Sequence, residues 1–327
     1  MIDGLVSTIV PVYNRPRQLR EAVESALRQD YRPIEIVIVD DGSTDETPDV
    51  AQALAHAYPN VVRVTRQANA GPGAARETGR KLTRGEFIQY LDSDDLLLPG
   101  KFSAQVAALR ADPAADVAYG ITHMRDADGA LGQAPHKRTG ERIATMFPAF
   151  LMSRWWETAT PLYRRTVTDA AGPWTALSLE EDWEYDCRVA SLGGRLVWVP
   201  LPVSEHRDHS GMRLSRGDAL DPTRMRQRAE SHRLILAHAL RAEVPLQSPE
   251  MQHFARALFL LARQCGAAGL PAQSRELFEA ARRASGPLRS RGADYRAYRS
   301  VASVIGWTAT GRASHWLDRW RKGARHG

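Results

Sequence analysis

The chain has 327 residues, enough for one large domain or two with a sizeable core. Its composition, 43% hydrophobic and 25% charged, is that of a soluble globular protein. No apolar run approaches the roughly 18 residues that cross a bilayer, and the N-terminus lacks the pattern of a secretory signal. Cys187 and Cys265 lie far apart without metal-type spacing, so we expect a reducing cytosol and no disulfide framework.

Positive charge is concentrated at the C-terminal end. The net charge is +6, but residues 281–327 hold eleven Arg and Lys against two Asp, a net +9, so the remainder carries −3. A basic tail on a mildly acidic body is typical of a protein with an anionic partner, either a membrane or a nucleic acid. An Arg-rich helix face in solvent explains the same pattern equally well.

The first part of the chain alternates between strand-like and helix-like stretches. Apolar runs predict strands over residues 6–12, 34–39, 61–64 and 87–91. The helices between them are expected to begin at Asn14 as a cap, at a capping box of Ser43 and Glu46, and at Gly71. This alternation predicts parallel βαβ units with right-handed crossovers, and therefore an α/β domain.

Three polar segments follow these strands and should share the sheet edge where ligands bind: residues 11–14, 40–43 and 92–95. The last segment holds three carboxylates within four residues. Because like charges this close repel, we expect a cation or a set of donors opposite them. Asp92 and Asp94 can face one point, and oxygen ligands suit Mg²⁺ or Mn²⁺. Acidic turns or helix caps are the alternative for both acidic segments.

Residues 71–76 imitate the start of a dinucleotide-binding fingerprint without completing it. Arg76 occupies the third glycine position, and this is not the first strand-to-helix turn of the chain. We expect instead a glycine-containing turn that places Arg76 and the helix N-terminus near a phosphate or a carboxylate. An ordinary helix start is the alternative.

Four ordered motifs resemble those of family 2 glycosyltransferases with the GT-A fold. They are Ile-Val-Pro-Val-Tyr-Asn at 9–14, Ile-Val-Asp-Asp-Gly-Ser-Thr-Asp at 38–45, Asn-Ala-Gly at 69–71 with Ala-Arg at 75–76 and Gly79, and Tyr-Leu-Asp-Ser-Asp-Asp at 90–95. The resemblance implies a Rossmann-like, mostly parallel sheet flanked by helices. It also implies a UDP-, GDP- or dTDP-sugar donor, inverting transfer, and Mn²⁺ or Mg²⁺.

The resemblance implies roles for individual residues as well. The donor nucleotide is expected to contact Pro11, Val12, Tyr13, Asn14, Asp40, Asp41, Arg76, Asp92 and Ser93. Asp92 and Asp94 form the Asp-x-Asp pair, of which Asp94 is the expected direct metal ligand. A cation suits this site because the nucleoside diphosphate leaves with concentrated negative charge.

A second stretch with catalytic chemistry covers residues 179–189, which predict a helix with Glu180, Glu181 and Asp182 at its start. The resemblance places the catalytic base at Asp182, with Glu181 beside it. An inverting transfer needs a carboxylate that takes the proton of the acceptor hydroxyl as its oxygen attacks. Because Glu180 precedes the pair, the assignment could shift by one residue. Acids in a first turn also complement the helix dipole, which is the alternative.

Histidine and tryptophan supply further candidates. The resemblance favours His209 over His206 as a third metal ligand, since Arg207 lies two residues before it. Imidazole suits Mn²⁺ better than Mg²⁺; ordinary surface histidines are the alternative. Sugar-ring stacking is predicted for three residues, with core packing as the alternative: Trp155, Trp156 and Trp183.

Beyond residue 215 the pattern is helical, with helices expected over 225–240, 252–265 and 271–284. The last two resemble a helical hairpin, which cannot bury its own face and should pack on the catalytic domain or a partner. Trp316 and Trp320 beside arginines suit a membrane surface. A docked terminal helix is the alternative.

We therefore predict a GT-A catalytic domain over 1–215 and a helical C-terminal region over 216–327. The expected reaction moves a sugar from a nucleoside-diphosphate sugar to a glycan or lipid-linked acceptor, in surface polysaccharide or glycoconjugate synthesis. We expect a cytoplasmic protein, peripheral at the inner face of an anionic membrane, with no nucleic acid partner. The alternatives are a nucleotidyltransferase, although residues 11–16 lack its glycine-rich loop, and a non-catalytic protein that works through the helical hairpin.

Overall fold

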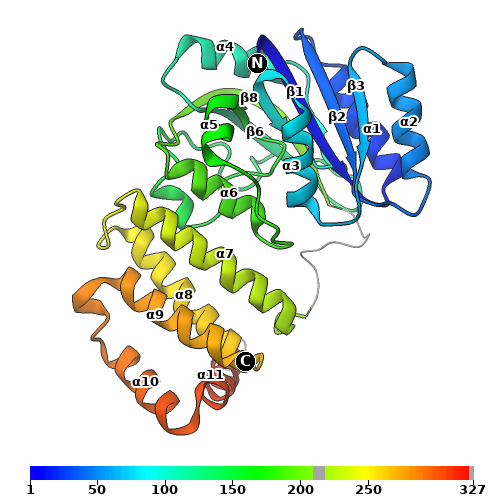
Figure 1. Ribbon diagram of the computed structural model, residues 1–327. Helices are drawn as coiled ribbons and strands as arrows, with labels where there is room; N and C mark the ends of the chain where they lie inside the picture. The colour runs from blue at the N-terminus through cyan, green and yellow to red at the C-terminus, as the bar shows by residue number, and fades with distance from the viewer. Residues whose placement is uncertain (209–217, 324–327) are drawn as a thin grey trace. The chain divides into compact units, whose positions relative to one another are not determined.

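The computed structural model describes residues 1–208 and 218–323. The chain divides into two compact units. An α/β unit holds residues 1–146 and 154–211, and a helical unit holds residues 147–153 and 212–327. Figure 1 shows the sheet and its helices in the first unit and the helices α7 to α11 in the second.

Within the described residues, the α/β unit is built on an eight-stranded sheet in the order β3-β2-β1-β4-β7-β6-β8-β5. The strands are β1 (Ile2–Val12), β2 (Ile34–Asp40), β3 (Val62–Arg66), β4 (Gly85–Tyr90), β5 (Leu96–Leu97), β6 (Val117–Arg125), β7 (Leu162–Arg164) and β8 (Leu196–Arg207). The first four pair in parallel, which confirms the predicted βαβ units. β6 and β8 are also parallel, whereas β7 runs antiparallel to both β4 and β6, so the sheet is mixed.

The central strands are apolar because helices cover both of their faces. Ile36 and Ile38 of β2 belong to the large core on one face, which includes Leu19 from the first helix. Val37 and Val39 point to the other face and pack with an alanine of the third helix. A strand buried on both faces reads as a continuous apolar run rather than an alternating one. The continuous apolar run of β2 therefore indicated a strand inside the sheet rather than at its edge.

The helices of this unit are α1 (Pro16–Leu27), α2 (Thr47–Ala57), α3 (Pro72–Leu82), α4 (Lys101–Ala111), α5 (Arg165–Ala171) and α6 (Glu181–Ala190). The predicted caps of α1 and α2 are wrong. Asn14 has a φ of +51°, so α1 begins after Arg15, and the Asn14 side chain accepts a hydrogen bond from the Thr44 amide at 2.8 Å. The Ser43 hydroxyl accepts from the Asn14 amide at 3.0 Å instead of capping α2. These bonds tie together the loops that follow β1 and β2.

The helical unit contains η1 (Ala149–Leu151), α7 (Pro222–Arg241), α8 (Pro249–Ala267), α9 (Pro271–Arg289), α10 (Ala293–Ile305) and α11 (Trp307–Gly323). α8 and α9 pack along each other as the predicted hairpin, and α7 and α11 cover it (Figure 1). Gly311 lets α11 approach α8 closely, since a Cβ there would lie 2.5 Å from the Ala267 amide nitrogen. The hairpin thus buries its face within its own unit.

No helix in the described ranges combines the length and apolarity needed to cross a bilayer.

Candidate active site

The loops that follow β1, β2 and β4 meet at one edge of the sheet, as the parallel pairing requires. Val12 pairs with Asp40 at the ends of β1 and β2, and Ile9 pairs with Tyr90 at the end of β4. Among the predicted nucleotide contacts here, Pro11, Val12 and Ser93 are buried, whereas Tyr13 and Asn14 are exposed. The exposed aromatic ring of Tyr13 is therefore accessible to a ligand at this edge.

Asp40 and Asp41 order the loops at this edge. Asp40 accepts a hydrogen bond from the Ser43 amide at 2.9 Å and forms an ion pair with Arg66 at 3.1 Å. The buried carboxylate of Asp41 accepts three hydrogen bonds, from Gln67 Nε2 at 2.8 Å and from the amides of Ala70 and Gly71 at 2.9 Å. The Asn-Ala-Gly motif at 69–71 is thus fixed against the acidic end of β2.

Arg76 joins two predicted site segments that are far apart in sequence. Its side chain is buried, with Nη2 at 2.6 Å from Asp92 Oδ1 and Nη1 at 2.8 Å from Glu181 Oε1. Its guanidinium also lies over the indole of Trp174, 4.7 Å from the ring centroid. Buried charges persist in proteins when they are paired and hydrogen-bonded. Arg76 therefore brings the acidic end of β4 next to the start of α6.

The three aspartates after β4 have different environments. Asp94 forms an ion pair with Arg15, the residue just before α1. Asp95 is buried, 2.9 Å from His206 Nδ1, and accepts a hydrogen bond from the Arg207 amide at 3.2 Å. Burial raises the pKa of Asp95 to about 6, although the charge of His206 opposes this shift. Asp95 thus anchors β8 to the site, while the side chains of Asp92 and Asp94 are partly exposed.

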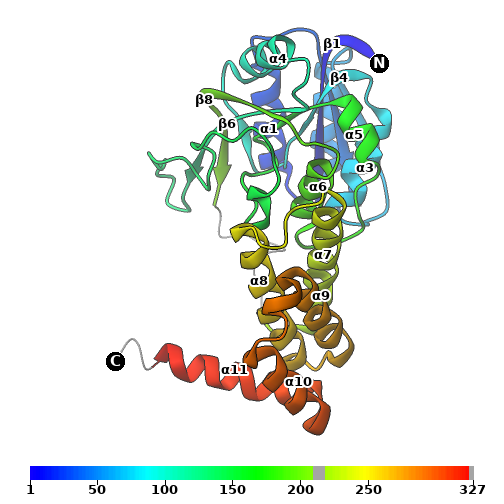
Figure 2. The ribbon, with the colours of Figure 1, turned by 90° about the vertical axis from the view of Figure 1, so that its left-hand side faces the viewer.

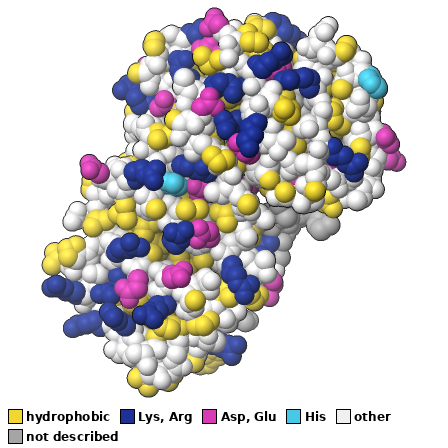
Figure 3. Space-filling model, viewed as in Figure 1, with side chains coloured by type: hydrophobic (Ala, Val, Ile, Leu, Met, Phe, Trp, Pro, Cys, Tyr) yellow, Lys and Arg dark blue, Asp and Glu magenta, His cyan; other side chains and the backbone are white. Residues whose placement is uncertain are grey.

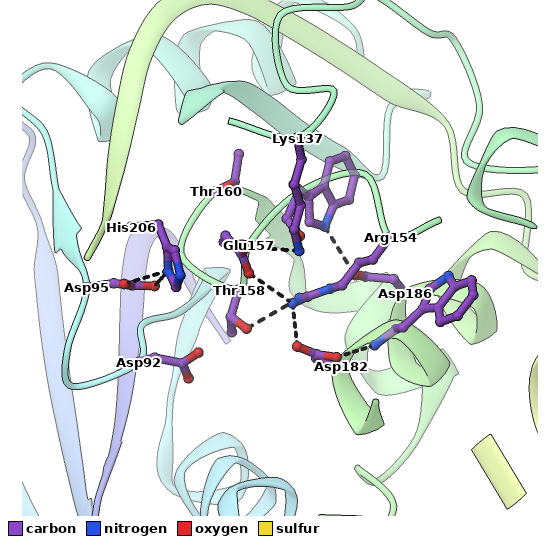
Figure 4. A network of polar contacts seen from close by, with 12 residues as sticks. Asp92, Asp95, Lys137, Arg154, Glu157, Thr158, Thr160, Asp182, Asp186 and His206 are labelled. Atoms are coloured by element: carbon purple, nitrogen blue, oxygen red, sulfur yellow. Dashed lines mark hydrogen bonds and ion pairs between the residues drawn. The ribbon is translucent and has the colours of Figure 1, made fainter. Parts of the chain in front are cut away.

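Arg154 is the centre of a second buried network, shown in Figure 4. It forms an ion pair with Asp182, and its Nε lies 3.0 Å from Asp186 Oδ2. Asp186 also accepts hydrogen bonds from the Tyr163 hydroxyl at 2.6 Å and from Trp156 Nε1 at 3.1 Å. Burial raises the pKa of Asp186, and the charge of Arg154 counters that effect. The two aspartates lie four residues apart, so α6 presents both to one guanidinium.

Glu181 and Asp182 are adjacent but differ in access. The side chain of Glu181 is 8% exposed and held by Arg76, whereas that of Asp182 is 27% exposed. Burial raises the pKa of Glu181, and the neighbouring charge of Asp182 adds to this, while Arg76 lowers it. Of these two carboxylates, Asp182 is the one an acceptor could reach.

A further cluster, which the sequence analysis did not identify, lies beside these networks. His136, Glu157 and His206 place one ligand atom each within 4.8 Å of one another, a geometry that can hold a metal ion. Oε1 of Glu157 also lies 2.9 Å from Lys137 Nζ, as Figure 4 shows. Burial alone would raise the pKa of Glu157, but the hydrogen bond with His136 and the charges of Lys137, His206 and Arg154 lower it.

The predicted aromatic residues divide into two groups. Trp155 is 1% exposed under the guanidinium of Arg138, and Trp156 is 0% exposed against the ring of Tyr119. Because both indoles lie in the core, we withdraw the expectation that they stack on a sugar. Trp183 is half-buried and remains a candidate. His209, the predicted third metal ligand, lies outside the described residues.

Solved glycosyltransferases have the same fold. Residues 1–349 of TarS from S. aureus, in complex with UDP-GlcNAc, superimpose with a TM-score of 0.70 at 21% identity, over 96% of this chain and 92% of that chain. The mannosyltransferase PcManGT from Pyrobaculum calidifontis, in complex with GDP-Man and Mn²⁺, gives a TM-score of 0.53 at 20% identity, over 96% and 87%. The fold of this chain is therefore GT-A with a helical extension, as predicted.

Sequence comparison leads to the family. An uncharacterized glycosyltransferase of Rickettsia felis is 40% identical over 129 residues, which are 38% of this chain and 21% of the relative. GlyG of Streptococcus pneumoniae is 44% identical over 97 residues, 29% of this chain and 32% of the relative. The chain thus spans less than half the length of either relative. The sequence model of Glycosyl transferase family 2 matches residues 7–173, half of the chain. This chain belongs to glycosyl transferase family 2.

Proposed function

We propose that this chain transfers a sugar, with inversion, from a nucleoside-diphosphate sugar to the hydroxyl of a glycan or lipid-linked acceptor. The observation that carries the proposal is the Arg76 bridge. It places Asp92, at the sheet edge that would bind the donor, beside Glu181 and the accessible Asp182. TarS and PcManGT, which share the fold, were solved with UDP-GlcNAc and GDP-Man, which supports a nucleotide-sugar donor here.

The donor would lie along the edge formed by the loops after β1, β2 and β4. Tyr13 offers an exposed ring at this edge, and hydrogen bonds fix the buried carboxylates of Asp40 and Asp41 there. Arg76 and Arg15 each lie against one carboxylate of the Asp-x-Asp pair. These two guanidiniums could exchange that partner for a diphosphate oxygen, since guanidinium binds phosphate in the same way.

Asp92 and Asp94 fit a divalent cation by the chemistry of their donor atoms. Carboxylate oxygens are the ligands preferred by Mg²⁺ and Mn²⁺. The cluster of His136, Glu157 and His206 is less suitable, because the ammonium of Lys137 already lies against Glu157. We therefore propose Asp94 as the direct metal ligand; His209, the further ligand predicted from the sequence, lies outside the described residues. When bound, the cation supplies positive charge opposite the departing diphosphate.

Asp182 would act as the general base. As the acceptor oxygen bonds to the anomeric carbon, the bond from that carbon to the diphosphate oxygen breaks, and the hydroxyl proton passes to the carboxylate. Arg154 would hold that carboxylate in position through its ion pair, while Asp186 holds Arg154 from the next turn of α6. The network thus offers a carboxylate that is held in position to accept the proton.

Calorimetric titration tests the donor and metal assignment. UDP, GDP and dTDP would each be titrated into the full chain with and without Mn²⁺. We expect one of them to bind, more tightly with Mn²⁺, and Asp94→Ala to lose the metal-dependent gain. Asp128→Ala also removes an aspartate side chain, but from an exposed turn, and this variant should bind as the unchanged protein does. Equal Mn²⁺-dependent affinity in both variants would refute the role given to Asp94.

A further inference from the structure

Large apolar side chains are exposed at the C-terminal end of the helical unit. They follow the kink of α9 and continue along α10 and α11: Leu288 (87% exposed), Val301 (45%), Val304 (83%), Ile305 (53%), Trp316 (65%) and Leu317 (43%). We call these six residues the exposed apolar group. Single exposed apolar residues are ordinary, but a group on consecutive elements marks an interaction surface. Figure 2 shows α10 and α11 at this end of the unit.

The exposed side chain of Val304 does not belong to the face by which α10 packs into the core. Its inner face is already packed: Tyr295 and Tyr298 are buried, and the ring of Tyr295 lies 4.8 Å from that of Phe259. With 100° between successive residues, Val304 lies on the side away from these tyrosines, and Val301 lies between the two sides. Helix α10 is therefore apolar on two sides, one in the core and one in solvent.

The packing of helix α11 on α8 holds Trp316 on the solvent-facing side of α11. The opposite face packs on α8 through Gly311, where a side chain would collide with the backbone of Gly266. Arg312 lies one turn before Trp316 on the exposed face. An indole and a guanidinium side by side on a solvent face are the pair that binds well at the boundary between lipid headgroups and acyl chains.

The charges around the exposed apolar group have one sign. Exposed arginines flank it at four positions: Arg291, Arg296, Arg299 and Arg312. Over the described part of the same segment, residues 288–323, the acids are Asp294 and Asp318, and each already forms an ion pair with an arginine of its own unit. On the face of the helical unit drawn in Figure 3, Lys and Arg also predominate over Asp and Glu.

We propose that this surface docks the chain on an anionic lipid bilayer. Val304, Ile305 and Trp316 would enter the headgroup boundary, and the arginines would meet lipid phosphates. A lipid surface fits better than a protein groove because these side chains project into solvent and exposed arginines flank them, whereas both acids of the described segment are already paired with arginines. The inference concerns the helical unit and does not depend on the reaction proposed for the α/β unit.

A thiol-reactive, environment-sensitive dye placed at Val304→Cys in the full chain tests the proposal. Both native cysteines are buried, and burial raises the pKa of Cys265 to about 12, so the introduced thiol is the one that reacts at neutral pH. With vesicles of phosphatidylcholine and phosphatidylglycerol, we expect the emission at position 304 to move to the blue. Dye at Ala237→Cys, an exposed position on α7, should not respond. High salt should weaken the response because it screens surface charge.

Charge-reversal variants measure how much electrostatic attraction contributes to vesicle binding. Each basic residue near an anionic surface strengthens binding by about fivefold, so Arg296→Glu with Arg299→Glu should weaken vesicle binding by at least about 25-fold. No vesicle response at position 304, or an equal response to pure phosphatidylcholine, would refute the proposal. So would a dye response that grows with protein concentration without lipid, because a second copy of the chain would then cover the surface.

Discussion

The two units of this chain differ in where their charged side chains lie. In the α/β unit, Arg76 and Arg154 are buried and each contacts two or more carboxylates. In the helical unit, charged side chains such as Arg289 and Asp294 lie near the surface, and apolar side chains such as Val304 are exposed. Burying an ion pair costs desolvation that its Coulomb energy often fails to recover, so such pairs add little net stability.

The difference indicates where each unit works. A fold gains little from buried arginines, so two of them paired with the acidic segments indicate a site whose carboxylates must be held in position. A fold also gains nothing from highly exposed apolar side chains such as Leu288 at the end of α9 and Val304 on α10, so their presence indicates a partner. Variants that remove charges from each unit test whether this contrast is real.

The largest expected effect is on the rate of sugar transfer. Asp182→Asn keeps the shape of the side chain but cannot accept a proton. The turnover number should fall by about 10²–10⁴-fold, the usual cost of losing a general base. Donor affinity should stay nearly unchanged, because the side chains expected to hold the nucleotide lie after β1, β2 and β4. Steady-state kinetics with calorimetry of donor binding measures both quantities.

Glu181→Gln is the matched variant for that experiment. If it is inactive while Asp182→Asn transfers sugar at nearly the normal rate, the base is Glu181. If both variants remain active, the acids of α6 serve only to hold Arg76 and Arg154, and the buried charge would have to be explained by structure alone.

The next effect is on stability. Arg154→Met leaves Asp186 buried without its cation, and losing one partner of a buried pair costs about 3–5 kcal/mol. Arg299→Met, an exposed residue of α10, should change the free energy of unfolding by less than about 0.5 kcal/mol. Urea unfolding of both variants at one pH gives the comparison, and equal losses would erase the contrast between the units.

The Arg154→Met effect should also depend on pH. The pKa of Asp186 is raised by burial, so its contribution favours the folded state at acid pH and is lost as pH rises through the pKa in the fold. Removing Arg154 raises that pKa further. The destabilisation should therefore be small in acid, where Asp186 is protonated, and grow toward neutral pH. A loss of stability that does not vary with pH would point to packing rather than charge.

The part of the fold with regular pattern could be predicted from sequence. The strands β1 to β4 stood out because strands buried on both faces are continuous apolar runs. Helix starts were less accurate: Asn14 and Ser43 resemble caps, but the structure uses them to bond one loop to another. The local sequence shows that a residue is able to cap a helix. It does not show whether a group in another loop binds that side chain instead.

Sequence supplied part of the candidate site. Motifs that follow strands led to the proposal of Asp92 and Asp94, and the family resemblance led to that of Glu181 and Asp182. Arg154, Glu157 and His136 could not be predicted, because they lie in irregular segments where no period or spacing marks them. Nor does composition show that residues 147–153, immediately before Arg154, group with the helical unit.

The smallest expected effect is at the surface pair of the helical unit. Arg289 lies 2.5 Å from Asp294, with both side chains nearly half exposed, and its hydrogen bond lowers the pKa of Asp294. The pair should therefore stabilise the fold above the ordinary pKa of an aspartate and lose that effect as pH falls. A double-mutant cycle with Arg289→Met and Asp294→Ala should give a coupling of about 0.2–1 kcal/mol, reduced by salt. The cycle is needed because Arg289 also lies over the ring of Tyr295, a contact the single variant removes as well.

A coupling free energy as large as the loss of stability in Arg154→Met would show that exposed and buried ion pairs are equivalent in this chain. Buried charge would then no longer mark the active site.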